Sequence, residues 1–253
     1  MATSSAFAEE IASESIASIG DSDHFSYTLG LRLKSTDMAA GADSAKIRPV
    51  IGLRYGKWRL GIGDKKTWLG VSQPGNEPSL SYQLIENKDL TIGLSVRAYN
   101  VSTGESNDLF ENGKNTIRFR ALINHKLDKN WGVGIDFTQD VLKQGDSSTL
   151  NLGLFYTWPV FSQSELIMNV GGRWATAEHW RNSQSAALPV MEIIPAKTGI
   201  GKLNTGATFK QSMNKNWAWY SSLSYYHDVG ANRNFSHSKD IFSGQLGILY
   251  FQK

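Results

Sequence analysis

The sequence has no cysteine, little proline and no long hydrophobic run, and each of these absences excludes a class of protein. Without cysteine among its 253 residues, the chain can form neither a disulfide framework nor a thiolate metal site. No apolar stretch approaches the roughly 18 residues that a transmembrane helix needs. The net charge of only +3 and the lack of a basic run argue against a nucleic-acid partner.

Hydrophobic residues are instead distributed with a period of two. In the segment 131–137 every second residue is large and apolar, and the segment 150–158 alternates in the same way except at Phe155. Alternation of this kind predicts strands with one apolar and one polar face. The polar segment between the two is short and contains Gly, Asp and Ser, which predicts an antiparallel hairpin.

The same alternation recurs along the rest of the chain and predicts about twelve strands, within a range of about ten to fourteen. The further predicted strands are 25–34, 45–56, 58–63, 79–86, 90–101, 116–127, 165–177, 200–213, 217–229 and 241–251. Tight turns of similar sequence, NKD, DKN and NKN, begin at Asn87, Asp128 and Asn214. The longest break, 178–199, is predicted to be a loop on the side opposite these turns, because outer-membrane barrels combine short turns with longer loops.

Alternation alone fits either a soluble β protein or a membrane barrel, and two further features favour the barrel. Strands of roughly ten residues suit a tilted membrane crossing, and aromatic residues at the ends of apolar faces resemble the girdles of outer-membrane barrels. We therefore predict a transmembrane antiparallel up-and-down β-barrel over residues 25–253, in contact with the lipid of the cell outer membrane. The residues predicted at the lipid interface are Trp131, Trp158, Trp174, Trp217 and Trp219.

The first 24 residues are polar and predict a flexible tail in front of the barrel. Within them, Ala6-Phe7-Ala8 fits the small-x-small cleavage site of a secretory signal peptide, although the basic and apolar regions of such a peptide are missing. The segment therefore has two interpretations: the remnant of a signal peptide on an exported protein, or an ordinary disordered leader.

If the apolar face contacts lipid, the polar face lines the lumen, and that face is rich in basic residues. Its predicted lining, a possible anion-binding surface, comprises Arg32, Arg48, Arg54, Arg97, Arg118, Arg120, Arg173 and Lys202, with Arg59 and Lys210 beside them. The acids on this face are fewer: Asp136, Asp140 and Asp228. One interpretation is a plugged interior whose charges are paired. The other is an anion-attracting pore or pocket, since rings of Arg and Lys favour anions.

The sequence offers little support for catalysis. The five histidines are scattered, and no metal-ligand spacing connects them. His227-Asp228 near Ser222 or Ser224 is the nearest approach to a hydrolase site, but no third partner stands at a fixed spacing. We predict a non-enzymatic protein with no catalytic residue, no metal and no cofactor.

Several segments resemble one known family. NTIRFRALINHKLDKNWGVGIDF, LIMNVGGRWATAEHW, GIGKLNTGATFKQSMNKNWAWY and the closing FSGQLGILYF are similar to the MltA-interacting protein (MipA)/OmpV family of outer-membrane proteins. The resemblance implies a barrel of a Gram-negative bacterium that acts as a scaffold, bridging a lytic transglycosylase and a peptidoglycan synthase. Other family members are porin-like or adhesin-like. The alternatives are therefore a narrow porin-like channel or binding barrel for small anionic solutes, and a surface adhesin that uses residues 178–199.

Overall fold

The fold is taken from a computed structural model that describes residues 25–36, 45–61, 79–100, 115–144, 147–185, 196–232 and 240–252. The statements below concern these residues. The predicted N-terminal tail, with its candidate cleavage site at residues 6–8, lies outside the described residues.

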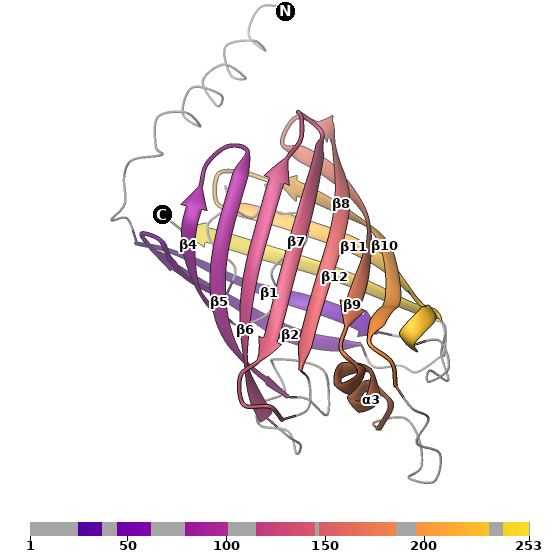
Figure 1. The fold of residues 1–253 in the computed structure, drawn as a ribbon. Helices are drawn as coiled ribbons and strands as arrows, with labels where there is room; N and C mark the ends of the chain where they lie inside the picture. Colours follow the sequence, from indigo (N-terminus) through magenta and orange to yellow (C-terminus); the bar gives the residue numbers. More distant parts are fainter. Residues whose placement is uncertain are drawn as a thin grey trace, which may run out of the picture.

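Twelve antiparallel strands form one closed barrel, in which each strand pairs with its neighbours in the sequence and β1 pairs with β12. The strands are β1 (Phe25–Thr36), β2 (Lys46–Tyr55), β3 (Trp58–Gly61), β4 (Leu80–Glu86), β5 (Leu90–Asn100), β6 (Asn115–Lys126), β7 (Trp131–Asp140), β8 (Ser148–Phe161), β9 (Ser164–Ala175), β10 (Gly199–Ser212), β11 (Trp217–Asp228) and β12 (Asp240–Gln252). Figure 1 shows the barrel from the side. The predicted fold class and strand number are confirmed.

Closure is made by the first and last strands. β1 and β12 pair in continuous register from Tyr27 opposite Gln252 to Thr36 opposite Ser243. β1 also pairs along most of its length with β2, so both of its edges are hydrogen-bonded. A barrel closed in this way leaves no exposed sheet edge, which a bilayer requires because unpaired backbone groups are costly in hydrocarbon.

The apolar residues of the strands point outward. On β1, Leu29, Leu31 and Leu33 keep 48%, 56% and 42% of their surface exposed, whereas Thr28 and Arg32, on the other parity, keep 1% and 4%. A continuous apolar exterior of this size would not be stable in water, but lipid covers it without cost. The molecule is therefore an outer-membrane barrel, and the predicted localisation is confirmed; its even strand number is that of single-chain bacterial barrels.

The two ends of the barrel differ. β1 begins and β12 ends at the end that carries the tight turns, here called the turn end (upper left in Figure 1). The opposite end, here called the loop end, carries the longer connections. The helix α3 (Ala177–Ser185) and the short 3₁₀ helix η3 (Gly230–Asn232) lie there. None of the described helices is long and apolar enough to cross a bilayer.

The prediction of a loop over 178–199 was wrong for its first part, which belongs to the helix α3. The helix lies at the end of the barrel opposite the tight turns, as predicted. Its sequence, AEHWRNSQS, begins with a strong helix former and an acid in the first turn, both of which favour a helix start. Alternation with a period of two identifies strands but not helices, because side chains repeat with a different period along a helix. Residues 186–195 lie outside the described part.

Three tight turns at the turn end share one hydrogen-bonding pattern. In each, the side-chain oxygen of the first residue, Asn87, Asp128 or Asn214, accepts hydrogen bonds from the backbone N–H groups two and three residues later, at 2.7–3.0 Å. Such Asx turns are a local preference of Asn and Asp. The similarity of NKD, DKN and NKN in the sequence therefore reflects one repeated backbone geometry.

Aromatic rings on the inner wall pack against glycines of neighbouring strands. Phe155, the exception to the alternation of β8, points inward and covers Gly132 of β7, where an added Cβ would lie 2.2 Å from its ring. Tyr220 of β11 covers Gly247 of β12 in the same way, at 2.3 Å. A glycine is required at both positions because a ring occupies the space of its missing side chain.

Candidate functional site

The barrel lumen is the candidate site, since it gathers the polar parity of all the strands. All eight basic residues predicted to line it lie on the inward parity, in β1, β2, β5, β6, β9 and β10, as do Arg59 and Lys210. Their role as an anion-binding surface stays a prediction. The expected acids Asp136, Asp140 and Asp228 also face inward. The sequence interpretation missed two further acids, Glu86 and Glu165, which pair with inward bases.

Several of the inward charges form ion pairs at mid-barrel and toward the turn end. Arg120 Nη2 lies 2.6 Å from Asp136 Oδ2, between β6 and β7. The Glu86 carboxylate accepts hydrogen bonds from two arginines, from Arg54 Nη2 at 3.2 Å and from Arg59 Nη2. The interior is thus charge-paired at these positions, in agreement with one of the two interpretations drawn from the sequence.

Water nevertheless reaches these pairs. The side chain of Arg120 keeps 28% of its surface exposed and that of Asp136 20%, although both point into the barrel. Glu86 keeps 32%. Because buried charges without hydration are costly, partial exposure of the pairs stabilises them. At these positions the side chains of the inner wall are accessible to water.

The part of the inner wall formed by β2, β11 and β12 is tightly packed. Val50, Ala218, Tyr220, Leu249 and Phe251, from β2, β11 and β12, form an apolar cluster in which each residue keeps at most 6% of its surface exposed. All five belong to the inward parity. This part of the inner wall is therefore apolar and closed to water.

Cations face cations across adjacent strands of the inner wall. The strand register places the following bases directly opposite one another: Arg32 and Arg48, Lys34 and Lys46, Arg54 and Arg59, Arg97 and Arg118, and Arg173 and Lys202. Like charges at directly opposed positions destabilise a sheet. Among the described residues, the inner wall therefore carries more basic than acidic side chains.

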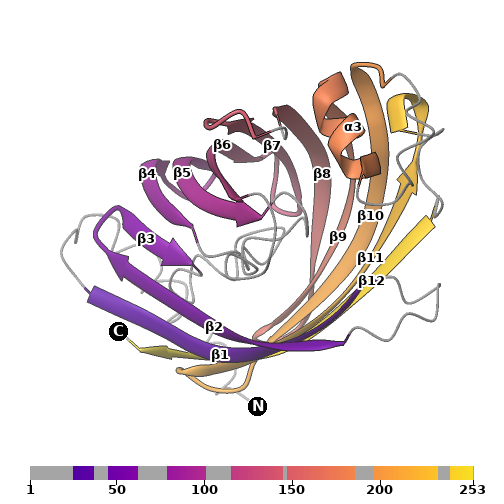
Figure 2. The ribbon, with the colours of Figure 1, turned by 90° about the horizontal axis from the view of Figure 1, so that it is seen from below.

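Near the loop end, α3 packs against the inner side of β10. The indole of Trp180 covers Gly201 and donates from Nε1 to the carbonyl oxygen of Gly199 at 3.2 Å. Trp180 is 1% exposed. Seen from the loop end, α3 lies within the outline of the barrel, beside β9 and β10 (Figure 2). The helix is therefore attached to the barrel wall at the loop end.

His179, next to Trp180 on α3, lies in a strongly positive environment. Burial, together with the charges of Arg173, Arg118 and Lys202, lowers the pKa of its imidazole from 6.5 to about 3. These three bases belong to β9, β6 and β10. His179 is therefore neutral at physiological pH, and three strands direct positive charge toward it.

The tryptophans predicted at the lipid interface point outward. Trp131, Trp158 and Trp217 lie at the turn end of their strands and are 42%, 51% and 40% exposed. Trp174 lies at the loop end of β9. Trp219 lies further along β11, with its ring 5.3 Å from that of Phe209. Their contact with the interface stays a prediction.

A repeated aromatic pair at the turn end was missed by the sequence interpretation. Trp131 pairs with Tyr156, Trp217 with Tyr250, and Trp58 with Tyr82, each pair directly opposite in register. Ring centroids lie 4.9–5.1 Å apart at interplanar angles of 61–62°. Each tryptophan is the first residue of a strand that follows a tight turn, and this is the signal that identifies the pairs in the sequence.

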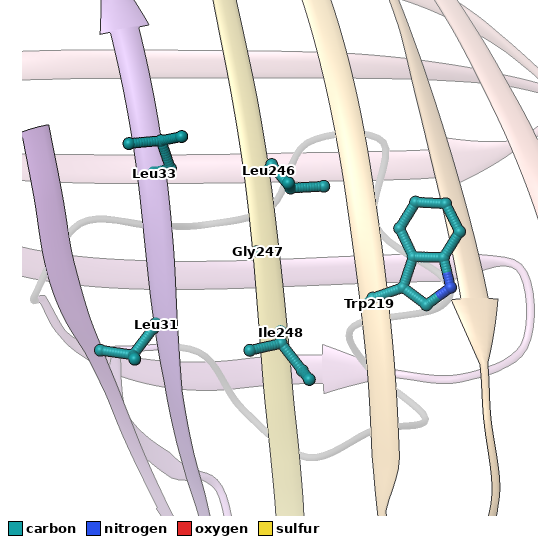
Figure 3. A pocket seen from close by; sticks show the side chains of 6 residues that line it. All are labelled: Leu31, Leu33, Trp219, Leu246, Gly247 and Ile248. Atoms are coloured by element: carbon teal, nitrogen blue, oxygen red, sulfur yellow. The ribbon is translucent and has the colours of Figure 1, made fainter. Parts of the chain in front are cut away.

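A shallow apolar pocket lies on the outside of the barrel. Its lining comes from β1, β11 and β12: Leu31, Leu33, Trp219, Leu246, Gly247 and Ile248. Figure 3 shows the side chains around Gly247, where the wall carries no side chain of its own. The pocket lies on the lipid-facing surface and is separate from the lumen.

The candidate hydrolase arrangement around His227 is not assembled. His227 lies on the outward parity of β11, whereas Asp228, Ser222 and Ser224 lie on the inward parity. His227 Nδ1 instead lies 2.7 Å from Asp240 Oδ1, which also accepts from the Tyr225 hydroxyl at 2.6 Å. Within the described residues, no group of three or more His, Asp or Glu side chains is arranged to hold a metal.

Comparisons with known proteins give a likeness of fold only. No family model and no curated protein matches the chain. Among solved structures, the chain is similar to OmpT, an outer membrane protein of Vibrio cholerae, with 9% identity, a TM-score of 0.41 and coverage of 93% of this chain and 100% of that one. It is also similar to the Ralstonia pickettii toluene transporter TbuX, with 10% identity, a TM-score of 0.41 and coverage of 91% and 90%. The assignment of the fold rests on the strand pairing of this chain itself.

Proposed function

We propose that the barrel is a narrow, non-enzymatic channel for small anionic solutes. The observation that carries the proposal is the set of directly opposed cation pairs on the inner wall, such as Arg173 with Lys202. Like-charged pairs cost stability, and arginine and lysine rings favour anions in pores. The water-accessible pairs at Arg120 and Glu86 support a hydrated path along one wall.

The reversal potential in planar lipid bilayers tests this function. Between KCl solutions of unequal concentration, we expect current through the reconstituted protein and a reversal potential whose sign reports preference for chloride over potassium. Asp136→Asn removes one lumen acid beside Arg120 and should increase that preference. A cation preference, or the lack of any current from correctly folded barrels, would overturn the channel.

A scaffold for peptidoglycan-remodelling enzymes, of the kind that resemblance to the MipA/OmpV family implies, is the second candidate. The observation that favours it is the turn end, where the turns at Asn87, Asp128 and Asn214 share one fixed geometry. The carbonyl oxygens of Asn130 and Asn216 also accept backbone hydrogen bonds from Thr157 and Phe251 of the following hairpin strands, at 2.8 Å. These hydrogen bonds give the turn end a rigid surface of the kind that a periplasmic partner can bind.

Binding to purified enzymes tests the scaffold. The barrel in detergent would be mixed with a lytic transglycosylase or a peptidoglycan synthase of the same bacterium, and complex formation would be measured by size-exclusion chromatography. We expect Lys129→Glu and Lys215→Glu, which change exposed turn residues, to weaken the complex. Lys143→Glu, at the loop end, is the matched control. Absence of a complex with either enzyme class would exclude this role.

A further inference from the structure

The loop end of the lumen contains a cluster of groups whose arrangement the channel proposal does not by itself require. The cluster consists of Arg118 on β6, Arg173 on β9, Lys202 on β10 and His179 on α3. Arg173 and Lys202 are directly opposite in register. All three cations lie close enough to His179 for their charges to act on its imidazole. Four separate elements thus converge at one level of the barrel.

The position of His179 in this cluster is fixed by its neighbour. The Trp180 ring packs on Gly201, the Trp180 indole bonds to Gly199, and the His179 and Trp180 rings meet edge to face with centroids 4.9 Å apart. The backbone N–H of Ala177 donates to Thr198 Oγ1 at 3.1 Å, which holds the start of the helix. Because α3 is held at several points, the imidazole is preorganised rather than free to move away.

Two cations of the cluster, Arg173 and Lys202, are held in place by side chains from neighbouring strands. Arg173 donates through Nε to the neutral Asn151 Oδ1 at 2.7 Å, and within the described residues no carboxylate lies within ion-pair distance of it. Lys202 lies 3.5 Å from Asp228 and 5.9 Å from the centre of the Tyr226 ring. Its side chain keeps 22% of its surface exposed. The guanidinium of Arg173 therefore presents its terminal N–H groups beside a water-accessible ammonium.

We propose that Arg173 and Lys202, beside His179, form a binding site for one small oxyanion, of the carboxylate or phosphate class, at the loop-end mouth of the lumen. Arg173 supplies the planar fork of donors that matches such an anion, and Lys202 supplies a second charge. His179, neutral at physiological pH, lies beside these cations and borders the site. The inference rests on the proposed channel, for which this site is the entry point that selects the solute.

Isothermal titration calorimetry of the detergent-solubilised full chain tests the site without relying on conduction. Inorganic phosphate is one probe and acetate the other, and the two arms distinguish a phosphate site from a carboxylate site. We expect saturable binding of at least one probe. Arg173→Gln should weaken it about tenfold or more, since loss of a charge-assisted hydrogen bond has an effect of this size. Arg173→Lys, which keeps the charge but not the fork, should recover part of the affinity.

The control is Lys143→Gln, which removes a positive charge from an exposed residue that follows β7 at the same end of the barrel. It should leave the affinity unchanged. Equal weakening by both variants would mean general attraction by the positive charge of the loop end and would overturn the site. Absence of saturable binding of either probe would overturn it as well. Heat-modifiable gel mobility shows that each variant is folded before its affinity is compared.

The imidazole of His179 gives a second readout. Bound phosphate places negative charge beside the ring, so the pKa of His179, measured by NMR, should rise from its low value when phosphate is added. An unchanged titration in the presence of bound phosphate would place the anion elsewhere. If binding holds but the reversal potential shows no anion preference, the channel fails while the site stands. The reverse result would leave a channel without this site.

Discussion

The indole of Trp180 occupies the space in which a side chain of residue 201 would lie. A Cβ added to Gly201 would be 2.4 Å from Cζ2 of Trp180 and 2.6 Å from Cε2. Both distances are well below van der Waals contact, so any larger residue at position 201 must displace the ring. This contact is one of the points at which α3, a helix outside the strand pattern, is attached to the barrel wall.

Gly201→Ala should therefore release α3. Accommodating the methyl group against the indole costs about 1–3 kcal/mol of packing energy, and this loss falls on the docking of the helix rather than on the strand ladder. We expect faster tryptic cleavage at Arg181, measured by mass spectrometry of the folded protein. Gly153→Ala is the matched control, because its nearest foreign atom lies 3.7 Å away. Equal cleavage rates in the two variants would contradict the attachment.

The Trp131–Tyr156 pair should contribute a measurable coupling energy. Its rings lie edge to face at 5.0 Å, an arrangement worth about 0.5–1.5 kcal/mol beyond area burial. A double-mutant cycle of Trp131→Leu and Tyr156→Leu, followed by denaturant unfolding in lipid vesicles, measures it. Additive effects of the two substitutions would show that the rings act only through separate contacts with lipid.

The turn at Asp128 should make stability depend on pH in the acid range. Backbone N–H groups of Trp131 and Asn130 hold the pKa of the Asp128 carboxyl below its usual value of 3.8. Because the folded pKa is below the unfolded one, the stabilisation is present above about pH 3.8 and is lost as the pH falls through the folded value. Carbon-detected NMR should give a midpoint below 3.8. A midpoint at or above that value would contradict the Asx geometry.

A substitution separates charge from geometry at the same turn. Asp128→Asn keeps the accepting oxygen, as Asn87 and Asn214 do at the equivalent positions, so it should keep the native thermal unfolding midpoint at neutral pH. Asp128→Ala removes the acceptor and should lower that midpoint. If both variants behaved alike, the side-chain oxygen would have no role in holding the turn.

Loss of the acid of the Lys210–Glu165 pair should lower the stability of the folded barrel more than removal of the base. Lys210 is fully buried on the inner wall, 3.5 Å from Glu165. Glu165→Gln leaves a buried cation without its ion-pair partner, which costs about 3–5 kcal/mol. Lys210→Met removes that cation and fills a similar volume, so its cost should be smaller. Unfolding by denaturant in vesicles compares the two, and the opposite order would refute the pairing.

The strand pattern could be predicted from the sequence because it depends on local alternation. Leu29, Leu31 and Leu33 share a parity in the sequence and share the outer face in the barrel, since side chains alternate along any strand whatever its neighbours. The basic residues from Arg32 to Lys202 were placed on the inner face by the same rule. The tight turns were found for a similar reason, because Asn and Asp form their hydrogen bonds within three residues.

Contacts between distant segments could not be predicted in this way. His227 and Asp228 are adjacent in the sequence, yet they point to opposite faces, and His227 pairs with Asp240 across the β11–β12 register. Glu165 and Glu86 were identified as lumen acids only by their proximity to Lys210, Arg54 and Arg59 on nearby strands. The helix α3 lies in a segment whose residues do not alternate, so the strand pattern did not predict it.

The sequence by itself determined the period of two, the face of each strand residue and the chemistry of the turns, because these are properties of a few neighbouring residues. Only the tertiary structure decided which bases face one another, which charges are paired, and that Trp180 fixes His179 among three cations. The physical reason is that these relations depend on strand register and on barrel closure. Both are settled by the sum of contacts around the whole sheet rather than by any one segment.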